Sequence, residues 1–314
     1  MKKEDDRFKI AIIGAGKVGM TAAYALLLGG GFHEIALYGR DKRKLLGEKL
    51  DLEHATALSH KTAISIADDP AELTNTDIFI FCAGAAQAIG ETRLQLAAKN
   101  LKIVDDLTPK LLNASPEAIL LMVTNPVDLL TLRAREINHS REGRIFGSGT
   151  LLDTARFRFH LSEFLPVHPR SIHAYVLGEH GDHSFPVISS ANIGGQPLTS
   201  FSEFSREKAL EAYYKARDAA SAIIESKGAT YYGIGASIAK IARSIIANGQ
   251  SVLTLSAVID GYYGQSGMAL SVPCVLGRNG IERIIKVSLD EGEQAGLKNC
   301  VTALKEAYFS SKPQ

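Results

Sequence analysis

A histidine in a glycine-rich, acidic stretch is the side chain of this sequence best suited to transfer a proton. The stretch reads LGEHGDH from Leu177 to His183, and His180 lies between two glycines. Glycines disfavour a helix interior and acidic residues disfavour a core strand, so we expect an exposed loop that holds the imidazole. Because imidazole titrates near neutral pH, such a loop can donate or accept a proton.

The partner expected for this histidine lies upstream, in the segment GSGTLLDTARFRFH. Asp153 and Arg156 are one helical turn apart there, so their side chains project from the same face of an amphipathic stretch. The carboxylate would orient the imidazole and stabilise its charged form, and the guanidinium would bind an anionic substrate through two hydrogen bonds. The alternative is that Asp153 only caps a helix and His180 is an ordinary loop histidine, because helix starts favour aspartate.

Length, composition and charge favour small-molecule chemistry. The 314 residues suffice for two domains with a full core, and 46% hydrophobic and 22% charged residues are typical of a globular protein. A net charge of +1 gives no reason to expect nucleic acid or an anionic membrane as a partner, and no apolar run reaches membrane-spanning length. Three cysteines without metal-ligand spacing indicate neither a disulfide framework nor a metal site, and favour the cytoplasm.

A glycine motif follows the first apolar run and predicts a dinucleotide site. The β-branched run FKIAII ends in GAGKVG, and a helical pattern follows, which is the context that GxGxxG requires. We expect Gly14 to allow the tight turn, Gly16 to let a pyrophosphate approach the backbone, and Gly19 to let helix pack on strand. Lys17 and Val18 lie between them at the helix start. The alternative is a glycine-rich turn without a ligand.

The second expected strand, Glu34 to Tyr38, ends without the acidic residue that usually binds the adenosine ribose. Gly39 and Arg40 stand at that point, and an arginine there commonly accommodates the 2′-phosphate of NADP. The sequence therefore predicts a cofactor site at Gly39 and Arg40 for NAD, with NADP tolerated or preferred. The alternative is that Arg40 belongs to the solvated basic start of the next helix and NAD binds through its other contacts.

Strands and helices alternate through the first half, which predicts an α/β fold with a Rossmann-type doubly wound parallel sheet. Two continuous apolar runs resemble strands buried on both faces, and they end near Gly84 and Asn125, where such a sheet binds ligands. After a turn at 147–150 the pattern changes to short β-rich pieces followed by long helices. We therefore expect a dinucleotide-binding domain over residues 1–147 and an α+β substrate domain over residues 148–314.

Five motifs in this order, the glycine loop, GETRL, TNPVD, LLDTARFR and GEHGDH, resemble those of the lactate/malate dehydrogenase family. The resemblance extends from about Lys9 to Lys305, and KGATYYGI and VPCVLGRNGI are similar to its lactate branch. It implies hydride transfer between a nicotinamide cofactor and a small 2-oxo or 2-hydroxy acid. It implies that His180 is the general acid and base and that Asp153 orients its imidazole. Arg156 would bind the substrate carboxylate, and Arg93 would polarise the carbonyl from a closing loop. Asn125 would position substrate and cofactor.

The resemblance also identifies the position that selects the substrate. Malate-specific relatives carry arginine where this chain has Gln87, and a neutral residue would leave the second carboxylate of oxaloacetate buried and unpaired. Pyruvate and lactate are therefore favoured. The small apolar loop around Gln87 leaves a broader L-2-hydroxyacid dehydrogenase, such as one acting on 2-hydroxyisocaproate, as the alternative, and Thr230 is the other expected pocket residue. A catalytically silent dinucleotide-binding protein would have lost a catalytic group, whereas this chain has all four.

Self-association, with a homotetramer as the expected state, is also implied by the resemblance. Arg158 and His173 fall where bacterial relatives bind the activator fructose 1,6-bisphosphate across a subunit interface. The alternative for this pair is a structural anion site or an ordinary polar interface, because two basic residues do not define a phosphate site.

Overall fold

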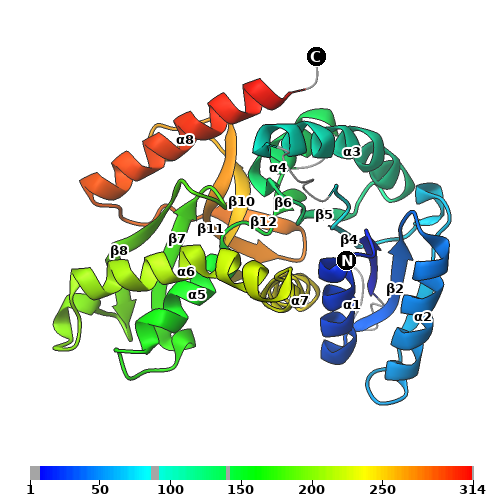
Figure 1. Ribbon diagram of the computed structural model, residues 1–314, viewed down its shortest axis with the longest axis horizontal. Helices are drawn as coiled ribbons and strands as arrows, with labels where there is room; N and C mark the ends of the chain where they lie inside the picture. Colours follow the sequence, from blue (N-terminus) through cyan, green and yellow to red (C-terminus); the bar gives the residue numbers. More distant parts are fainter. Residues whose placement is uncertain (1–7, 86–91, 139–141, 313–314) are drawn as a thin grey trace.

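The computed structural model describes residues 8–85, 92–138 and 142–312, and these form one continuous sheet with helices on its faces (Figure 1). The strand order is β3-β2-β1-β4-β5-β6-β10-β11-β7-β8-β9, and β12 pairs with β11 at the side. The pairs among the first six strands are all parallel, whereas the printed pairs among the later strands are antiparallel. The order 3-2-1-4-5-6 is that of a Rossmann-type doubly wound sheet, so the expected fold class is confirmed.

The first half contains the parallel strands and the helices that connect them. Its elements are β1 (Phe8–Ile13), α1 (Lys17–Gly29), β2 (Phe32–Tyr38), α2 (Lys42–Thr56), β3 (Ala63–Ile66), β4 (Ile78–Phe81), α3 (Arg93–Ala114), β5 (Ile119–Met122), α4 (Val127–Ile137) and β6 (Ile145–Gly147). The apolar runs of β4 and β5 are buried along their whole length, as continuous hydrophobic strands predict. Helix α3 begins after Thr92, which forms a reciprocal capping box with Gln95.

Antiparallel strands and longer helices make up the second half. Its elements are α5 (Leu151–Ser162), β7 (Ile172–Gly178), β8 (Ser184–Ile193), β9 (Gln196–Pro197), α6 (Arg206–Lys227), α7 (Tyr232–Ile246), β10 (Ser251–Ile259), β11 (Met268–Gly277), β12 (Gly280–Ile284) and α8 (Glu291–Ser311). Single 3₁₀ turns occur at Pro70–Glu72, Pro169–Ser171 and Leu198–Ser200. None of the helices in the described ranges has both the length and the apolar composition needed to cross a bilayer.

The two halves share a sheet and a core. Strand β6, the last parallel strand, pairs with β10 through Gly147 and Ser256, so the sheet passes from one half into the other. The larger hydrophobic cluster includes buried residues of β1, β4 and β5 together with residues of β10, β11 and α8. A smaller cluster lies between α5, α6, β7 and β8. The proposed division at residue 147 therefore falls inside a continuous sheet, which accounts for the absence of a linker sequence there.

Candidate active site

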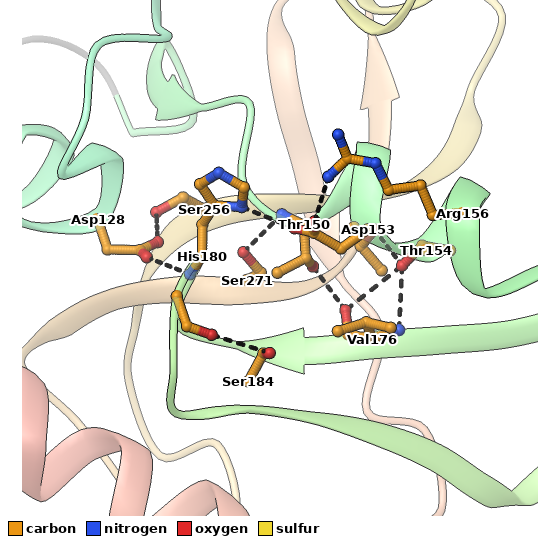
Figure 2. A network of polar contacts seen from close by, with 12 residues as sticks. Asp128, Thr150, Asp153, Thr154, Arg156, Val176, His180, Ser184, Ser256 and Ser271 are labelled. Carbon is orange, nitrogen blue, oxygen red and sulfur yellow. Dashed lines mark hydrogen bonds and ion pairs between the residues drawn. The ribbon is translucent and has the colours of Figure 1, made fainter. Parts of the chain in front are cut away.

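His180 and Asp153 meet where the loop after β7 passes the first turn of α5 (Figure 2). The Nδ1 atom of His180 lies 2.6 Å from Oδ2 of Asp153, and Nη1 of Arg156 donates to the other carboxylate oxygen at 3.3 Å. The capping alternative for Asp153 does not hold, because the N-cap residue of α5 is Thr150 and Asp153 is the third residue of the helix. Its carboxylate is thus available to the imidazole.

The loop is less exposed than the sequence suggested. Leu177 and Gly178 are the buried end of β7, and the side chain of His180 is only 29% exposed. The glycine does provide the turn, because Gly178 has a φ of +93°. The imidazole therefore lies partly inside the protein and not on a fully solvated loop.

Two threonines fix α5 to the strand that leads to His180. The hydroxyl of Thr150 donates to the carbonyl of Val176 at 2.5 Å, and the N–H of Val176 donates to the hydroxyl of Thr154 at 3.0 Å. The N–H of Thr150 donates to the hydroxyl of Ser271 on β11. Because all three groups are buried, these bonds hold the start of α5 against β7 and so set the distance between Asp153 and His180.

This arrangement makes His180 a cation at neutral pH. Burial opposes protonation of the imidazole, but the charge and the hydrogen bond of Asp153 outweigh it, and the pKa of His180 is raised to about 8. Burial also opposes ionisation of Asp153, yet the charge of His180 and their hydrogen bond keep the pKa of that carboxyl below its ordinary value. With Nδ1 bonded to Asp153, Nε2 is the ring nitrogen that can pass a proton to a substrate.

A second carboxylate, which the sequence analysis had not assigned a role, binds the backbone of the same histidine. Asp128 in the first turn of α4 accepts the N–H of His180 at 2.7 Å and the hydroxyl of Ser256 at 2.5 Å. Only 2% of Asp128 is exposed, and burial raises the pKa of its carboxyl to about 6. The signal that could have identified it is an acidic residue in the otherwise apolar run VDLL, directly after the Asn125–Pro126 strand end.

The three motif glycines differ in what surrounds them. Gly14 has a φ of +106°, which favours glycine, and an added Cβ would lie 2.7 Å from the backbone N of Ala83. A Cβ on Gly19 would lie 2.2 Å from the carbonyl oxygen of Gly14, so this glycine permits close packing. A Cβ on Gly16 would meet nothing within 4 Å, and no side chain caps α1 at this N-terminus. The open space and the uncapped helix end fit a pyrophosphate.

A cleft of about 880 Å³ adjoins this glycine loop. Its lining includes Gly14, Gly16, Gly39 and Gly84, the apolar side chains Ile103 and Leu107, and the cations Arg40, Lys44 and Lys102. Arg40 is exposed in this cleft, and the nearby Asp41 caps α2 by accepting the N–H of Lys44. Polar and apolar surfaces in a cleft of this size fit a dinucleotide.

Asn125 lies at the carboxyl end of β5, beside the start of the expected substrate loop. Its carbonyl accepts a hydrogen bond from Nδ2 of Asn100 on α3 at 2.8 Å. The Oδ1 atom of Asn100 accepts the N–H of Ala85, also at 2.8 Å. Gln87 lies outside the described residues. Arg93 is the first residue of α3, and its side chain is likewise outside the description.

The other predicted residues lie farther from the imidazole. Lys17 and Val18 form the first turn of α1, and the ammonium of Lys17 lies 5.9 Å from the ring centroid of Tyr231. Thr230 is half-buried between α6 and α7. Arg158 donates to the carbonyl of Ala174 at 2.8 Å and stacks over Tyr175, while His173 is exposed on β7. In the part of the chain that the structure describes, no three His, Cys, Asp or Glu side chains are grouped to hold a metal ion.

A cleft that fits a dinucleotide and an imidazole that can carry a proton are the two parts that a dehydrogenase needs, because hydride transfer to a carbonyl carbon must be matched by a proton at its oxygen. Residues 8–147 match the NAD binding domain of lactate/malate dehydrogenases, and residues 150–311 match the alpha/beta C-terminal domain of the same family. The chain belongs to the lactate/malate dehydrogenase family.

Relatives along almost the whole chain carry the lactate name. An L-lactate dehydrogenase of Kosmotoga olearia is 42% identical over 309 residues, covering 96% of each chain, and one of Moorella thermoacetica is 43% identical over 304 residues, covering 95% of this chain and 96% of the relative. The solved structure of a minor L-lactate dehydrogenase from Enterococcus mundtii superposes with a TM-score of 0.94 at 32% identity, covering 98% of this chain and 99% of that one.

Proposed function

We propose that this chain catalyses the L-lactate dehydrogenase reaction, the reversible reduction of pyruvate to L-lactate. The observation that carries the proposal is the 2.6 Å contact of His180 with Asp153, which keeps a proton on the imidazole at neutral pH. The lactate name of the relatives supports pyruvate as the substrate, and no observation favours a larger 2-oxo acid.

NADH bound in the cleft would supply the hydride. The chain's own residues would supply the proton and hold the acid: Nε2 of His180 donates a proton to the carbonyl oxygen, and Asp153 stabilises the imidazolium before that transfer. Arg156, which lies beside Asp153, would bind the substrate carboxylate as a planar, always charged fork. In lactate oxidation His180 accepts the proton instead.

The remaining substrate contacts would come from the loop before α3, from the start of that helix and from the segment between α6 and α7. Arg93, at the start of that helix, would polarise the carbonyl, and Gln87 would leave no partner for a second carboxylate. Asn100 of α3 connects the residue before this loop to the segment after β5, because it bonds both Ala85 and the carbonyl of Asn125. Thr230 would contribute to the substrate pocket.

The test compares the initial rates for pyruvate, oxaloacetate and 2-oxoisocaproate with NADH. We expect the highest kcat/KM with pyruvate, and a His180→Asn variant should lose about 10²- to 10⁴-fold, the usual magnitude of general acid catalysis. A higher kcat/KM with 2-oxoisocaproate would indicate the broader hydroxyacid dehydrogenase. A loss of only a few-fold in His180→Asn would contradict the assigned proton donor.

We further propose that NADP is accepted besides NAD. Arg40 and Lys44 line the cleft after β2, where a 2′-phosphate would lie, and the residue before them is a glycine instead of an acid. The ratio of kcat/KM with NADPH to that with NADH tests this. An NADH preference of about a hundredfold, or about 2.7 kcal/mol, would show that Arg40 does not bind the phosphate.

Assembly and compartment are proposals as well. Tyr24 and Leu28 of α1 and Phe159 of α5 expose about half of their surfaces, which supports self-association, with a homotetramer as the expected state. Arg158 and His173 would then bind fructose 1,6-bisphosphate at an interface between subunits. Light scattering with and without this sugar phosphate tests both. Three free cysteines agree with the reducing cytoplasm.

A further inference from the structure

Asp128 is a buried ionisable group beside the reacting histidine, and the mechanism above does not use it. Its carboxylate accepts two hydrogen bonds, one from the N–H of His180 and one from the hydroxyl of Ser256. Ser256 lies on β10 and is completely buried. Helix α4, strand β10 and the histidine loop therefore meet at this single carboxylate (Figure 2).

We propose that Asp128 is a positioning residue for proton transfer, which fixes the backbone of His180 and favours the imidazolium from the side opposite Asp153. Figure 2 shows the two carboxylates on opposite sides of the histidine, Asp153 at Nδ1 and Asp128 at the backbone N–H. The inference deepens the proposed reaction and rests on it for its kinetic consequences only. The protonation of His180 in the protein without substrate is a separate observable.

Two features favour an electrostatic role over a purely structural one. A neutral side chain could accept the N–H of His180 equally well. Burying a carboxylate costs free energy unless an opposite charge or hydrogen bonds stabilise it. The charge of Asp128 is also present in the pH range in which His180 titrates, because the pKa of Asp128 is about 6 and that of His180 is about 8.

The other charged and titratable groups around this pair come from three elements. Asp153 and Arg156 of α5 face His180 with opposite effects on its pKa. Glu179, in the loop itself, disfavours the charge of Asp128, and its carboxylate binds His183 instead of His180. Cys300 of α8 receives the N–H of Glu179, and burial raises the pKa of this thiol so that it stays neutral. Asp128 is therefore the only carboxylate among these named groups, besides Asp153, that bonds His180.

The experiment measures the pKa of His180 directly, by histidine-selective ¹³C NMR of the cofactor-free protein. His180→Asn assigns the resonance among the nine histidines. Asp128→Asn keeps an acceptor for the N–H of His180 and removes the charge, so we expect the pKa of His180 to fall by about 0.5 to 1. Glu179→Gln is the matched control, because it removes one charge from the same loop without changing a bond to His180.

Ser256→Ala provides a second variant that keeps the carboxylate. Loss of the hydroxyl removes a bond that lowers the pKa of Asp128, so a larger fraction of Asp128 is protonated near neutral pH. The pKa of His180 should then fall in the same direction but by less than in Asp128→Asn. If the pKa of His180 is unchanged in both variants, or if Glu179→Gln lowers it as far as Asp128→Asn does, the proposal is overturned.

Kinetics in the two directions give the second readout. Reduction needs the imidazolium and oxidation needs the neutral ring, so Asp128→Asn should slow pyruvate reduction about three- to tenfold above pH 8 and accelerate lactate oxidation near pH 6.5. A structural defect would lower the rates of pyruvate reduction and of lactate oxidation at every pH, and that result would refute the electrostatic role. Absence of turnover in the unmodified protein would instead refute the proposed reaction, while the NMR comparison would still decide the role of Asp128.

Discussion

Replacing Asp153 by asparagine should make the activity of this protein strongly pH-dependent around neutrality. The substitution retains the shape of the side chain and removes the charge that lies 2.6 Å from Nδ1 of His180. A pKa raised from 6.5 to about 8 corresponds to about 2 kcal/mol in favour of the imidazolium. Without the carboxylate, burial and Arg156 lower the pKa of His180 and Asp128 alone among the named groups raises it, so we expect a pKa near or below 6.5.

The size of the kinetic effect follows from these values. At pH 8 about half of His180 is protonated in the unmodified protein, and about 3% would be protonated with a pKa of 6.5. Pyruvate reduction by Asp153→Asn should therefore be at least about 15-fold slower at pH 8, and loss of the orienting bond adds to this. At pH 5.5 most of His180 is protonated in both proteins, so only the rate loss from the missing orienting bond persists.

The assay is kcat/KM for pyruvate with NADH from pH 5.5 to 9.5. The matched control is Glu163→Gln, because Glu163 pairs with His160 at 3.0 Å at the C-terminal end of the same helix but faces solvent. The control should retain the activity and the pH profile of the unmodified protein. If the ratio of rates between Asp153→Asn and the unmodified protein is the same at pH 5.5 and pH 8, Asp153 does not set the pKa of His180 and the reasoning fails.

Three further predictions concern the cofactor loop, the substrate carboxylate and stability. Gly16→Ala should change the free energy of unfolding by less than about 1 kcal/mol but weaken NADH binding about tenfold. Gly19→Ala should instead lower the melting temperature, because its methyl group would lie 2.2 Å from a backbone carbonyl oxygen. Calorimetry measures the stability of each variant, and fluorescence titration measures its NADH affinity. Arg156→Lys should raise KM for pyruvate about tenfold or more, because an ammonium cannot form the two-pronged pair; an unchanged KM in steady-state assays would remove Arg156 from the substrate site. Because the pKa of His180 is raised on folding, protonation of this residue stabilises the fold by about 2 kcal/mol below pH 6.5, and this stabilisation is lost as the pH rises through about 8. The free energies of unfolding in urea of the unmodified protein and of His180→Gln should therefore differ more at pH 6 than at pH 9.

Local residue types determined much of the first half in advance. The apolar runs of β4 and β5, the capping box at Thr92 and the glycine loop each act over a few neighbouring residues, so their positions could be predicted from the order of residues. Helix α4 was not anticipated. It follows Pro126 directly and its sequence, VDLLTLRAREI, is buried over most of its first two turns, which weakens the alternation of polar and apolar residues that indicates a helix.

The reacting pair was partly predictable, and its surroundings were not. His180 and Asp153 could be proposed from side-chain chemistry alone, because an imidazole in a loop needs a carboxylate and few candidates have a guanidinium one turn away. The bonds of Thr150 and Thr154 to Val176 hold the pair together, but threonines at a helix start have many roles, and no spacing rule selects a carbonyl on another strand.

The sequence by itself determined the dinucleotide loop, the parallel half of the sheet and the types of the groups that exchange protons, because these depend on local conformation and intrinsic chemistry. Only the tertiary structure decided that Asp128 binds the backbone of His180, that Ser256 completes this contact, and that Gly147 joins two halves in one sheet. Asp128 and His180 are 52 residues apart, and Asp128 and Ser256 are 128 apart. Such contacts form because distant elements pack on a common core, and burial together with the neighbouring charges and hydrogen bonds then sets the pKa of each group.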